Sequence, residues 1–202
     1  MDRQCNIPLG MQQQKPEKTA MQKEMNNDND SQLAWLKMAI RILDTEGWRE
    51  MKIKTIGDRL GVTKGSFYHW FKSKRDFEWQ VLAYWKSRFT QGFIEQAETG
   101  QNAREKLSLL GQQCIDGCIE GNRLEFEINA WSQADDQVKA FVTSVYEQRH
   151  GYLLHLLEGI YDDPAEVKRH GLMLYCLVIG IDLFYRQLSR EELEMIFADY
   201  LV

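Results

Sequence analysis

Apolar side chains recur at spacings of three and four residues along most of the chain, which is the pattern of amphipathic helices. The first run predicts a helix of about 15 residues, since Asp30 or Ser31 can cap its start and Gly47 can end it in a left-handed turn. The apolar residues at this spacing are Leu33, Leu36, Ile40 and Leu43, with Ala39 beside them.

Two short helices are predicted next, on either side of the three-residue turn 61–63. The apolar face of the first is formed by Ile53, Ile56 and Leu60. The second covers residues 64–71, and we expect the Thr63 side chain to cap it by accepting the backbone N–H of Ser66.

A long fourth helix is predicted over about residues 74–97, with Ser73 as its cap and Asp76 near the capping-box position. Five further helices are predicted at roughly 102–119, 122–134, 137–160, 164–187 and 190–201. The chain contains only three prolines, and no segment reads as a convincing strand. The sequence therefore predicts an all-α protein of about nine helices.

Charged residues are unevenly distributed along the chain, whose net charge is −5. Residues 1–31 carry 4 basic and 5 acidic groups and almost nothing to bury, so we expect a disordered tail there. Residues 32–79 carry 10 basic and 6 acidic groups (net +4), whereas residues 80–202 carry 11 and 19 (net −8). A basic segment of this kind is either a polyanion-binding surface or a chance cluster on a solvated face.

The second and third predicted helices have the arrangement of a helix-turn-helix, because Gly61 permits a sharp turn between them. The side chains that can bury against the first helix are Ile56, Leu60, Val62, Phe67 and Phe71. The side chains left on the other faces of the third helix are Lys64, Ser66, Tyr68, His69 and Trp70. Such side chains can reach base edges and phosphates in a major groove. The competing interpretation is a small helical hairpin whose aromatic residues form a core.

The stretch from Ile56 to Lys74, which reads IGDRLGVTKGSFYHWFKSK, closely resembles the DNA-binding signature of the TetR family of bacterial transcription regulators. The resemblance extends over residues 32–79 and includes the position of this stretch between one helix and a long following helix. It implies a three-helix DNA-binding head at 32–79, after the tail at 1–31, and a larger helical body at 80–202 that binds a ligand and dimerises.

The resemblance also implies roles for residues of the head. Residues 63–66 would form the groove-facing end of the third helix, while Tyr68 and His69 would contact phosphate or a thymine methyl group. Lys54 would touch phosphate or a base, and Lys74 would hold the DNA backbone at the start of the fourth helix. The complete expected DNA-binding set is Lys52, Lys54, Thr63, Lys64, Gly65, Ser66, Tyr68, His69, Trp70 and Lys74.

Two positions of the head depart from the family pattern. Lys52 stands at the start of the second helix, where a hydroxyl side chain is usual, and it can replace a hydroxyl–phosphate contact with an ion pair. Gly57 stands where alanine is usual, which makes this helix less stable by roughly 1 kcal/mol.

For the body, the resemblance implies a small-molecule pocket and a dimer interface. The candidate pocket residues are Phe89, Phe93, Cys114, Trp131, Tyr146, His150 and Tyr175. The helix predicted at 164–187 is apolar around most of its circumference, so it needs a second partner surface. We therefore expect residues 164–201 to pair with their symmetry mates. In the first of these helices the contact positions, at spacings of three and four, would be Leu172, Tyr175 and Ile179, and the last helix would add Leu193, Ile196, Phe197, Tyr200 and Leu201.

Other chemistry has little support in the sequence. Glu147 and His150 match one half of a di-iron motif without its second half, and Cys114 and Cys118 are more simply small buried residues than metal ligands or oxidant sensors. No catalytic motif, targeting segment or membrane-length apolar run is present, so we expect a cytoplasmic protein that is not an enzyme and has no cofactor.

The leading interpretation is a dimeric regulator, most often a repressor in this family, which binds an inverted-repeat operator in double-stranded DNA and releases it when a small molecule binds the body. The alternative is a helical ligand- or metal-binding protein that does not bind DNA.

Overall fold

The computed structural model describes residues 31–120, 123–182 and 187–201. Within these ranges every regular element is a helix, which confirms the predicted all-α class. The predicted tail lies outside the described residues except for Ser31, and so do residues 183–186 of the helix predicted at 164–187; its predicted last residue, Gln187, is described and is not helical.

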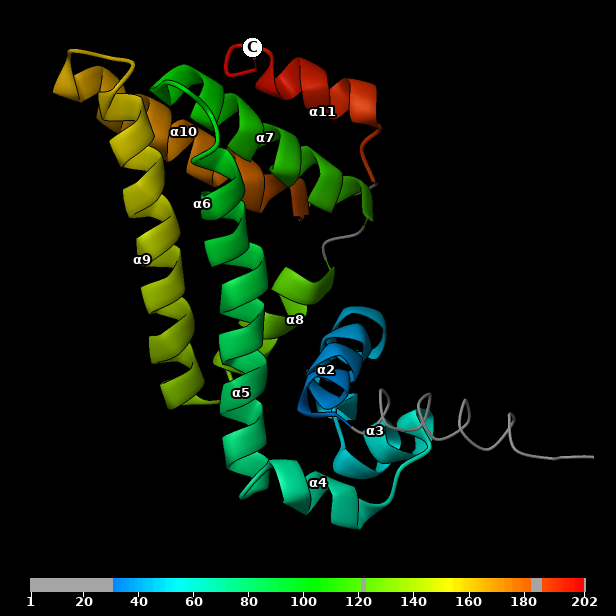
Figure 1. Ribbon diagram of the computed structural model, residues 1–202. Coiled ribbons are helices and arrows are strands. Elements are labelled where there is room, and N and C mark those ends of the chain that lie inside the picture. Colours follow the sequence, from blue (N-terminus) through cyan, green and yellow to red (C-terminus); the bar gives the residue numbers. More distant parts are fainter. Residues whose placement is uncertain (1–30, 121–122, 183–186, 202) are drawn as a thin grey trace, which may run out of the picture.

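Four short elements form the head, at the lower right of Figure 1. They are α2 (Gln32–Glu46), the 3-10 turn η1 (Trp48–Glu50), α3 (Ile53–Leu60) and α4 (Lys64–Trp70). The predicted ends of α2 are confirmed, because the Ser31 hydroxyl accepts the Ala34 N–H and Gly47 adopts a φ of 98°. The predicted side-chain cap of α4 is wrong: the Ser66 N–H donates to the backbone carbonyl of Thr63 at 3.1 Å, not to its hydroxyl.

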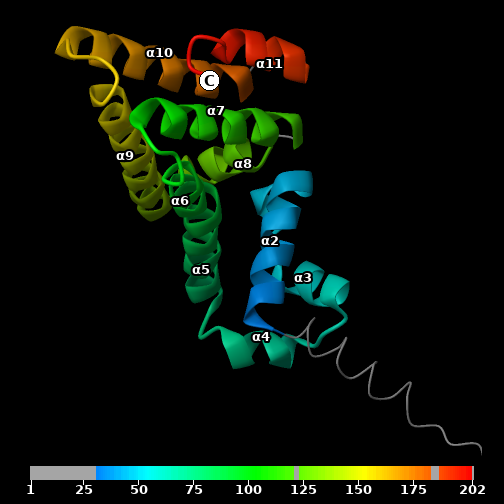
Figure 2. The same ribbon diagram turned by 45° about the horizontal axis from the view of Figure 1, so that its top comes forward.

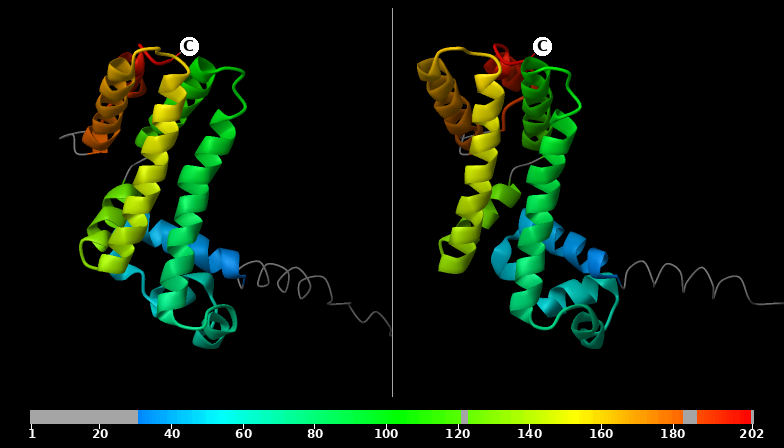
Figure 3. Two further views of the ribbon diagram at one scale, coloured as in Figure 1. Left: turned by 90° about the vertical axis from the view of Figure 1, so that its left-hand side faces the viewer. Right: turned by 60° about the vertical axis from the view of Figure 1, so that its left-hand side comes forward.

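The predicted fourth helix is interrupted near its middle. It consists of α5 (Lys74–Lys86), a π-helical turn η2 (Ser87–Gln91) and α6 (Gly92–Ala97), which run on in one direction from the head to the far end of the body (Figures 1 and 3). A π-turn widens the helix locally and displaces backbone carbonyls from the regular ladder. Apolar spacing alone does not reveal such a turn.

Five helices complete the body: α7 (Ala103–Glu120), α8 (Arg123–Ser132), α9 (Asp136–Glu158), α10 (Pro164–Asp182) and α11 (Arg190–Phe197). Helix α9 runs alongside α5 and α6, while α7, α10 and α11 lie together at the end of the molecule away from α4 (Figures 1 and 2). Helix α8 lies between α2 and α9 and packs against both, so it joins the head to the body.

Two clusters of buried side chains hold these elements together. One begins around Trp35 in the head and continues through α5 and α8 to Val145 of α9. The other joins α7, α9, α10 and α11 around Ile115, Leu157 and Phe197. The first cluster crosses from head to body, and this continuity fixes α4 relative to the body.

Helices α10 and α11 are only partly buried. Leu172, Met173 and Ile179 are each about half exposed on α10, and Met195 is exposed on α11. The expectation that Tyr175 shares the outer face with Leu172 and Ile179 is wrong, because its hydroxyl donates to the Tyr146 carbonyl at 3.2 Å within the protein. The expectation that Leu193 and Phe197 of α11 take part in the contact between subunits is also wrong. Both side chains are buried within the same chain.

Candidate nucleic-acid interface

A cluster of four aromatic rings fixes the position of α4. The Trp35 ring of α2 meets Phe67 at 5.3 Å and Phe71 and Phe77 at 6.4 Å each, all edge to face. Phe67 and Phe71 are almost completely buried. Edge-to-face pairs add a directional preference to the burial energy, so this face of α4 is held towards the core and the opposite face is directed outward.

The turn between α3 and α4 depends on two glycines. Gly61 adopts a left-handed φ of 70°, and the Val62 N–H returns to the Gly57 carbonyl at 3.0 Å. A Cβ atom on Gly57 would lie 3.3 Å from the Val62 carbonyl oxygen and 3.4 Å from the Trp35 ring. The tighter of these contacts is to the Val62 carbonyl, so the absence of a Cβ at Gly57 relieves crowding in the turn that follows α3.

The outward face of α4 carries most of the predicted contact residues. Lys64, Gly65 and His69 are exposed, Tyr68 is 54% exposed, and Ser66 is partly exposed. The Lys64 ammonium lies 5.9 Å from the centre of the Tyr68 ring.

Thr63 is exposed at the start of the same helix. Trp70 is partly buried against the head core, and its ring lies 4.5 Å from the His69 ring.

Two lysines lie at the start of α3. Both Lys52 and Lys54 are exposed. Lys52 provides no side-chain hydrogen bond to cap α3, and its ammonium pairs with the Glu50 carboxylate at 2.9 Å. Because that pair is on the surface, it contributes little to stability and can exchange for a phosphate contact.

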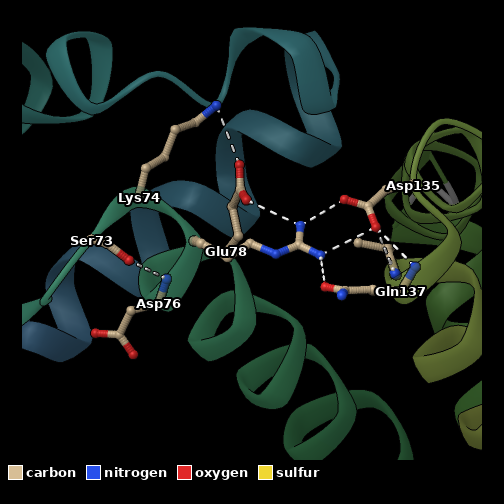
Figure 4. Close-up of polar contacts among 8 residues, drawn as sticks. Ser73, Lys74, Asp76, Glu78, Asp135 and Gln137 are labelled. Carbon is tan, nitrogen blue, oxygen red and sulfur yellow. Dashed lines mark hydrogen bonds and ion pairs between the residues drawn. The ribbon is translucent and has the colours of Figure 1, made fainter.

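The start of α5 carries a side-chain helix cap and an exposed lysine (Figure 4). The Ser73 hydroxyl accepts the Asp76 N–H at 3.0 Å, and the Asp76 carboxylate accepts the Lys72 N–H at 2.8 Å. This second bond lowers the pKa of Asp76. Lys74 is exposed, and its ammonium lies 3.3 Å from the Glu78 carboxylate.

An ion pair ties the same end of α5 to the body. The Arg75 guanidinium donates to Asp135 at 2.7 and 3.2 Å and to the Gln137 amide oxygen at 2.7 Å (Figure 4). Asp135 also caps α9 by accepting the N–H groups of Gln137 and Val138. The Arg75 hydrogen bonds hold the pKa of Asp135 below its usual value. One carboxylate therefore links the end of α5 that follows α4 to the start of α9.

Helix α8 forms a second link between head and body. The Leu124 N–H donates to the Asp44 carboxylate of α2 at 3.1 Å. The Glu127 carboxylate accepts the Trp48 N–H at 3.0 Å, and the Trp48 ring stacks on Trp131 with an interplanar angle of 5°. Helix α8 is thus attached to the head where α2 ends and η1 begins.

A cavity of about 760 Å³ lies in the body beside this junction. It is bounded by α2 on the head side and by η2 and helices α6 to α11 on the body side. Four predicted pocket residues line it, namely Phe89, Phe93, Cys114 and Tyr175. Its volume falls within the range of small-molecule sites.

The other three predicted pocket residues lie elsewhere. Trp131 is buried in the α8–η1 stack, and the Tyr146 hydroxyl accepts the Asn129 amide N–H at 2.6 Å. Burial raises the pKa of Tyr146 well above its usual value. His150 lines a separate hollow of about 640 Å³ between α9 and the start of α10.

A partly buried ion pair forms one wall of the larger cavity. The Arg149 guanidinium lies 3.1 Å from the Glu125 carboxylate, and its Nε donates to the Thr90 hydroxyl at 2.7 Å. It also donates to the carbonyl of Phe89 at 3.2 Å, within the π-turn. The Trp85 indole N–H donates to Glu125 at 3.0 Å. Arg149 thus fastens the irregular turn of the long helix to α8 and α9.

Sequence reasoning missed the residues that join head and body. Arg75 and Asp135 are 60 positions apart, and Asp44 and Leu124 are 80 apart, so no local pattern connects them. The local signal that existed was Asp135 as a candidate helix cap.

Metal sites and membrane spans were both searched for among the described residues. Among the described residues, no group of three or more His, Cys, Asp or Glu side chains is arranged to hold a metal ion. No described helix is long and apolar enough to cross a bilayer.

Comparisons with known proteins agree with this geometry. Residues 36–77 match the family model described as bacterial regulatory proteins, tetR family. No curated protein matches the chain in sequence.

Three solved structures resemble the chain at 19% identity. E. coli NemR in its reduced form has a TM-score of 0.68, over 85% of this chain and 97% of its own. SCO4454, a TetR-family transcriptional regulator from Streptomyces coelicolor, has a TM-score of 0.67, over 88% and 96%. A putative transcriptional regulator of the TetR/AcrR family has a TM-score of 0.68, over 85% and 100%. The chain therefore carries a TetR-family helix-turn-helix domain at residues 36–77 within the fold of TetR-family transcriptional regulators.

Proposed function

We propose that the protein is a homodimeric repressor that binds an inverted-repeat operator through α4 and releases it when a small molecule enters the cavity of the body. The observation that carries this proposal is the division of α4 into two faces. Phe67 is buried in the aromatic cluster, while Lys64, Tyr68 and His69 are directed outward from a rigid support. A major groove accepts one helix of this kind per half-site.

The head offers different chemistry for positioning and for base recognition. Thr63 and Ser66 present hydroxyl groups at the first turn of α4, and Gly65 between them lets the backbone approach the bases closely. Lys52, Lys54 and Lys74 would lie along the flanking phosphates. Both the Lys52–Glu50 and Lys74–Glu78 pairs are exposed, so a phosphate can replace the carboxylate at low cost.

The dimer would form through α10 and α11 within residues 164–201. These helices expose Leu172, Met173 and Ile179, and they lie at the end of the molecule away from α4 (Figure 1). A two-fold contact at that end leaves both α4 helices free to face DNA. Two heads related by such an axis read a site with matching two-fold symmetry.

A bound ligand would release DNA by moving the long helix formed by α5, η2 and α6. The cavity touches η2 and α6 at one end of this helix, whereas Lys74 and the Arg75–Asp135 pair lie at the other end. A ligand that shifts η2 therefore moves the start of α5 and changes the separation of the two heads. With DNA as the partner, we place the protein in the bacterial cytoplasm, as a regulator and not an enzyme.

Selection of bound fragments from random duplex DNA, followed by gel shifts on the selected site, tests the proposal. We expect an inverted repeat whose affinity falls steeply with salt, with a log–log slope near −0.9 for each phosphate neutralised. A preferred site without a dyad, or an affinity that does not depend on salt, would contradict it. Failure to select any DNA would favour the alternative of a ligand-binding protein that does not bind DNA.

A further inference from the structure

The larger cavity is basic on its head side. Lys37 and Arg41 of α2 and Arg88 of η2 line it, and all three side chains are exposed. Lys37 and Arg41 are four residues apart, so they lie on the same face of α2. None of the three cations has a carboxylate oxygen within 4.0 Å among the residues that the structure describes. They are therefore open to an anion from solvent.

The acidic side chains of the same lining are engaged with other groups. Glu125 pairs with Arg149 at 3.1 Å, and Asp116 pairs with Arg190 at 2.7 Å. The third, Asp44, accepts a backbone N–H at the start of α8 at 3.1 Å. The lining therefore keeps a surplus of positive charge on its head side.

The far side of the cavity is apolar. Phe93 of α6, Leu110 of α7 and Val178 of α10 line it, and each is partly exposed, so a bound molecule can touch them. Helices α7 and α10 lie at the end of the molecule away from α4 (Figures 1 and 2). Along the long helix Arg88 precedes Phe93 and is nearer to the head. The cavity thus has a basic side by α2 and an apolar side towards α7 and α10.

These two sides together select one kind of molecule. An inorganic anion would pair with the cations and leave the apolar side unfilled, whereas an uncharged molecule would leave the cations unused. A carboxylate suits the basic side, because a guanidinium can donate two parallel N–H bonds to it. An apolar body gains free energy by leaving water against Phe93 and Leu110.

We propose that the cavity binds an organic anion with an apolar body, with a carboxylate held by Lys37, Arg41 and Arg88 and the body packed against α6, α7 and α10. The inference rests on the proposed function, since it names the chemistry of the effector that would release DNA. A molecule held in this way contacts the head through α2 and the long helix through η2. It therefore bridges the two parts whose relative position sets the separation of the heads.

Naphthoate and naphthamide, substituted at the same ring position, form a matched pair of probes. They have the same shape and differ in a carboxylate against an uncharged amide. We expect naphthoate to bind the full-length protein about tenfold more tightly in isothermal titration at neutral pH and low salt. The ratio should shrink as salt rises from about 0.05 M to about 0.5 M, because the three cations are exposed.

Substitutions in the lining assign the preference to its two sides. Arg41→Gln and Arg88→Gln should each weaken naphthoate about threefold and leave naphthamide unchanged, and the double variant should lose most of the preference. Arg104→Gln is the matched control, since Arg104 is exposed on α7 outside the lining and its substitution removes the same charge. Leu110→Ala should weaken both probes and keep their ratio.

Equal binding of the two probes by the native protein overturns the inference, as does no naphthoate binding at all or a full preference in the double variant. Should the double variant fail to fold, the ratio in the native protein and its salt dependence decide. Gel shifts on the selected operator without any probe test the proposed function separately. Operator binding together with equal probe affinities would overturn the ligand chemistry and leave the regulator intact. A naphthoate preference without operator binding would support the site and overturn the proposed function.

Discussion

The substitution Ile179→Arg should separate the dimer without unfolding the subunit. Ile179 is 50% exposed on α10, so an arginine there can extend into solvent in the free subunit. In the dimer the same position would be desolvated. Removing the half of the isoleucine side chain that the dimer would bury costs about 1 kcal/mol of dimer stability, or about 2 kcal/mol for the two symmetry-related residues. An unpaired charge in the contact adds about 3 kcal/mol or more, and the sum of about 5 kcal/mol raises the dimer Kd more than a thousandfold.

Sedimentation velocity at micromolar protein measures the effect on assembly, and gel shifts measure its effect on DNA. We expect a monomer whose operator affinity is much reduced, because each head alone makes half of the contacts. The thermal midpoint of the subunit should change little. Phe126→Arg is the matched control, since Phe126 is 55% exposed on α8, outside residues 164–201.

Two results would refute this reasoning in different ways. A variant that remains dimeric and binds its operator normally would move the interface away from α10, most plausibly to α9. A variant that unfolds would show that Ile179 contributes to the subunit core, contrary to its half-exposed position.

The remaining predictions concern the head, the α5–α9 link and the cavity wall. Lys74→Ala should weaken binding to all DNA sequences and reduce the salt slope by about one, whereas Ser66→Ala should relax base preference by about 1–3 kcal/mol at most, both measured by gel shift. Asp135→Asn should lower the free energy of unfolding at pH 7, and the difference from the native protein should shrink on acidification. The folded pKa of Asp135 is depressed, so its contribution is complete above its unfolded pKa of about 3.9 and is lost as pH falls through the lower folded value. Arg149→Met should cost about 2–3 kcal/mol in denaturant unfolding because it leaves Glu125 unpaired, and adding Glu125→Gln should recover part of the loss.

Each of these assignments has an outcome that contradicts it. A change of sequence preference in Lys74→Ala would make that lysine a base contact. A stability difference for Asp135→Asn that grows towards acidic pH would reverse the sign of the linkage. A double variant at 149 and 125 no more stable than Arg149→Met would show that the two side chains are not coupled.

Local chemistry allowed much of the head to be predicted from the sequence. The ends of α2 and the start of α5 follow from Ser31, Gly47 and Ser73, whose preferences depend on a few neighbouring residues. The turn before α4 follows from Gly61, which adopts the left-handed conformation that its position requires. The exposed face of α4 follows from the burial of Phe67, because one helix cannot bury every face.

Other features were decided by tertiary structure, because they depend on which partner each helix face meets. Thr63 occupies the cap position of α4 without using its hydroxyl, and Tyr175 turns into the body although its spacing matches the outer face of α10. The Arg75–Asp135 pair joins residues 60 positions apart, which only folding brings together. The cavity is lined by residues of α2, η2, α6 and α7, which lie far apart in the sequence and are brought together only by folding. Periodicity determines which residues form a helix, but the environment of each face is set by packing against elements distant in sequence.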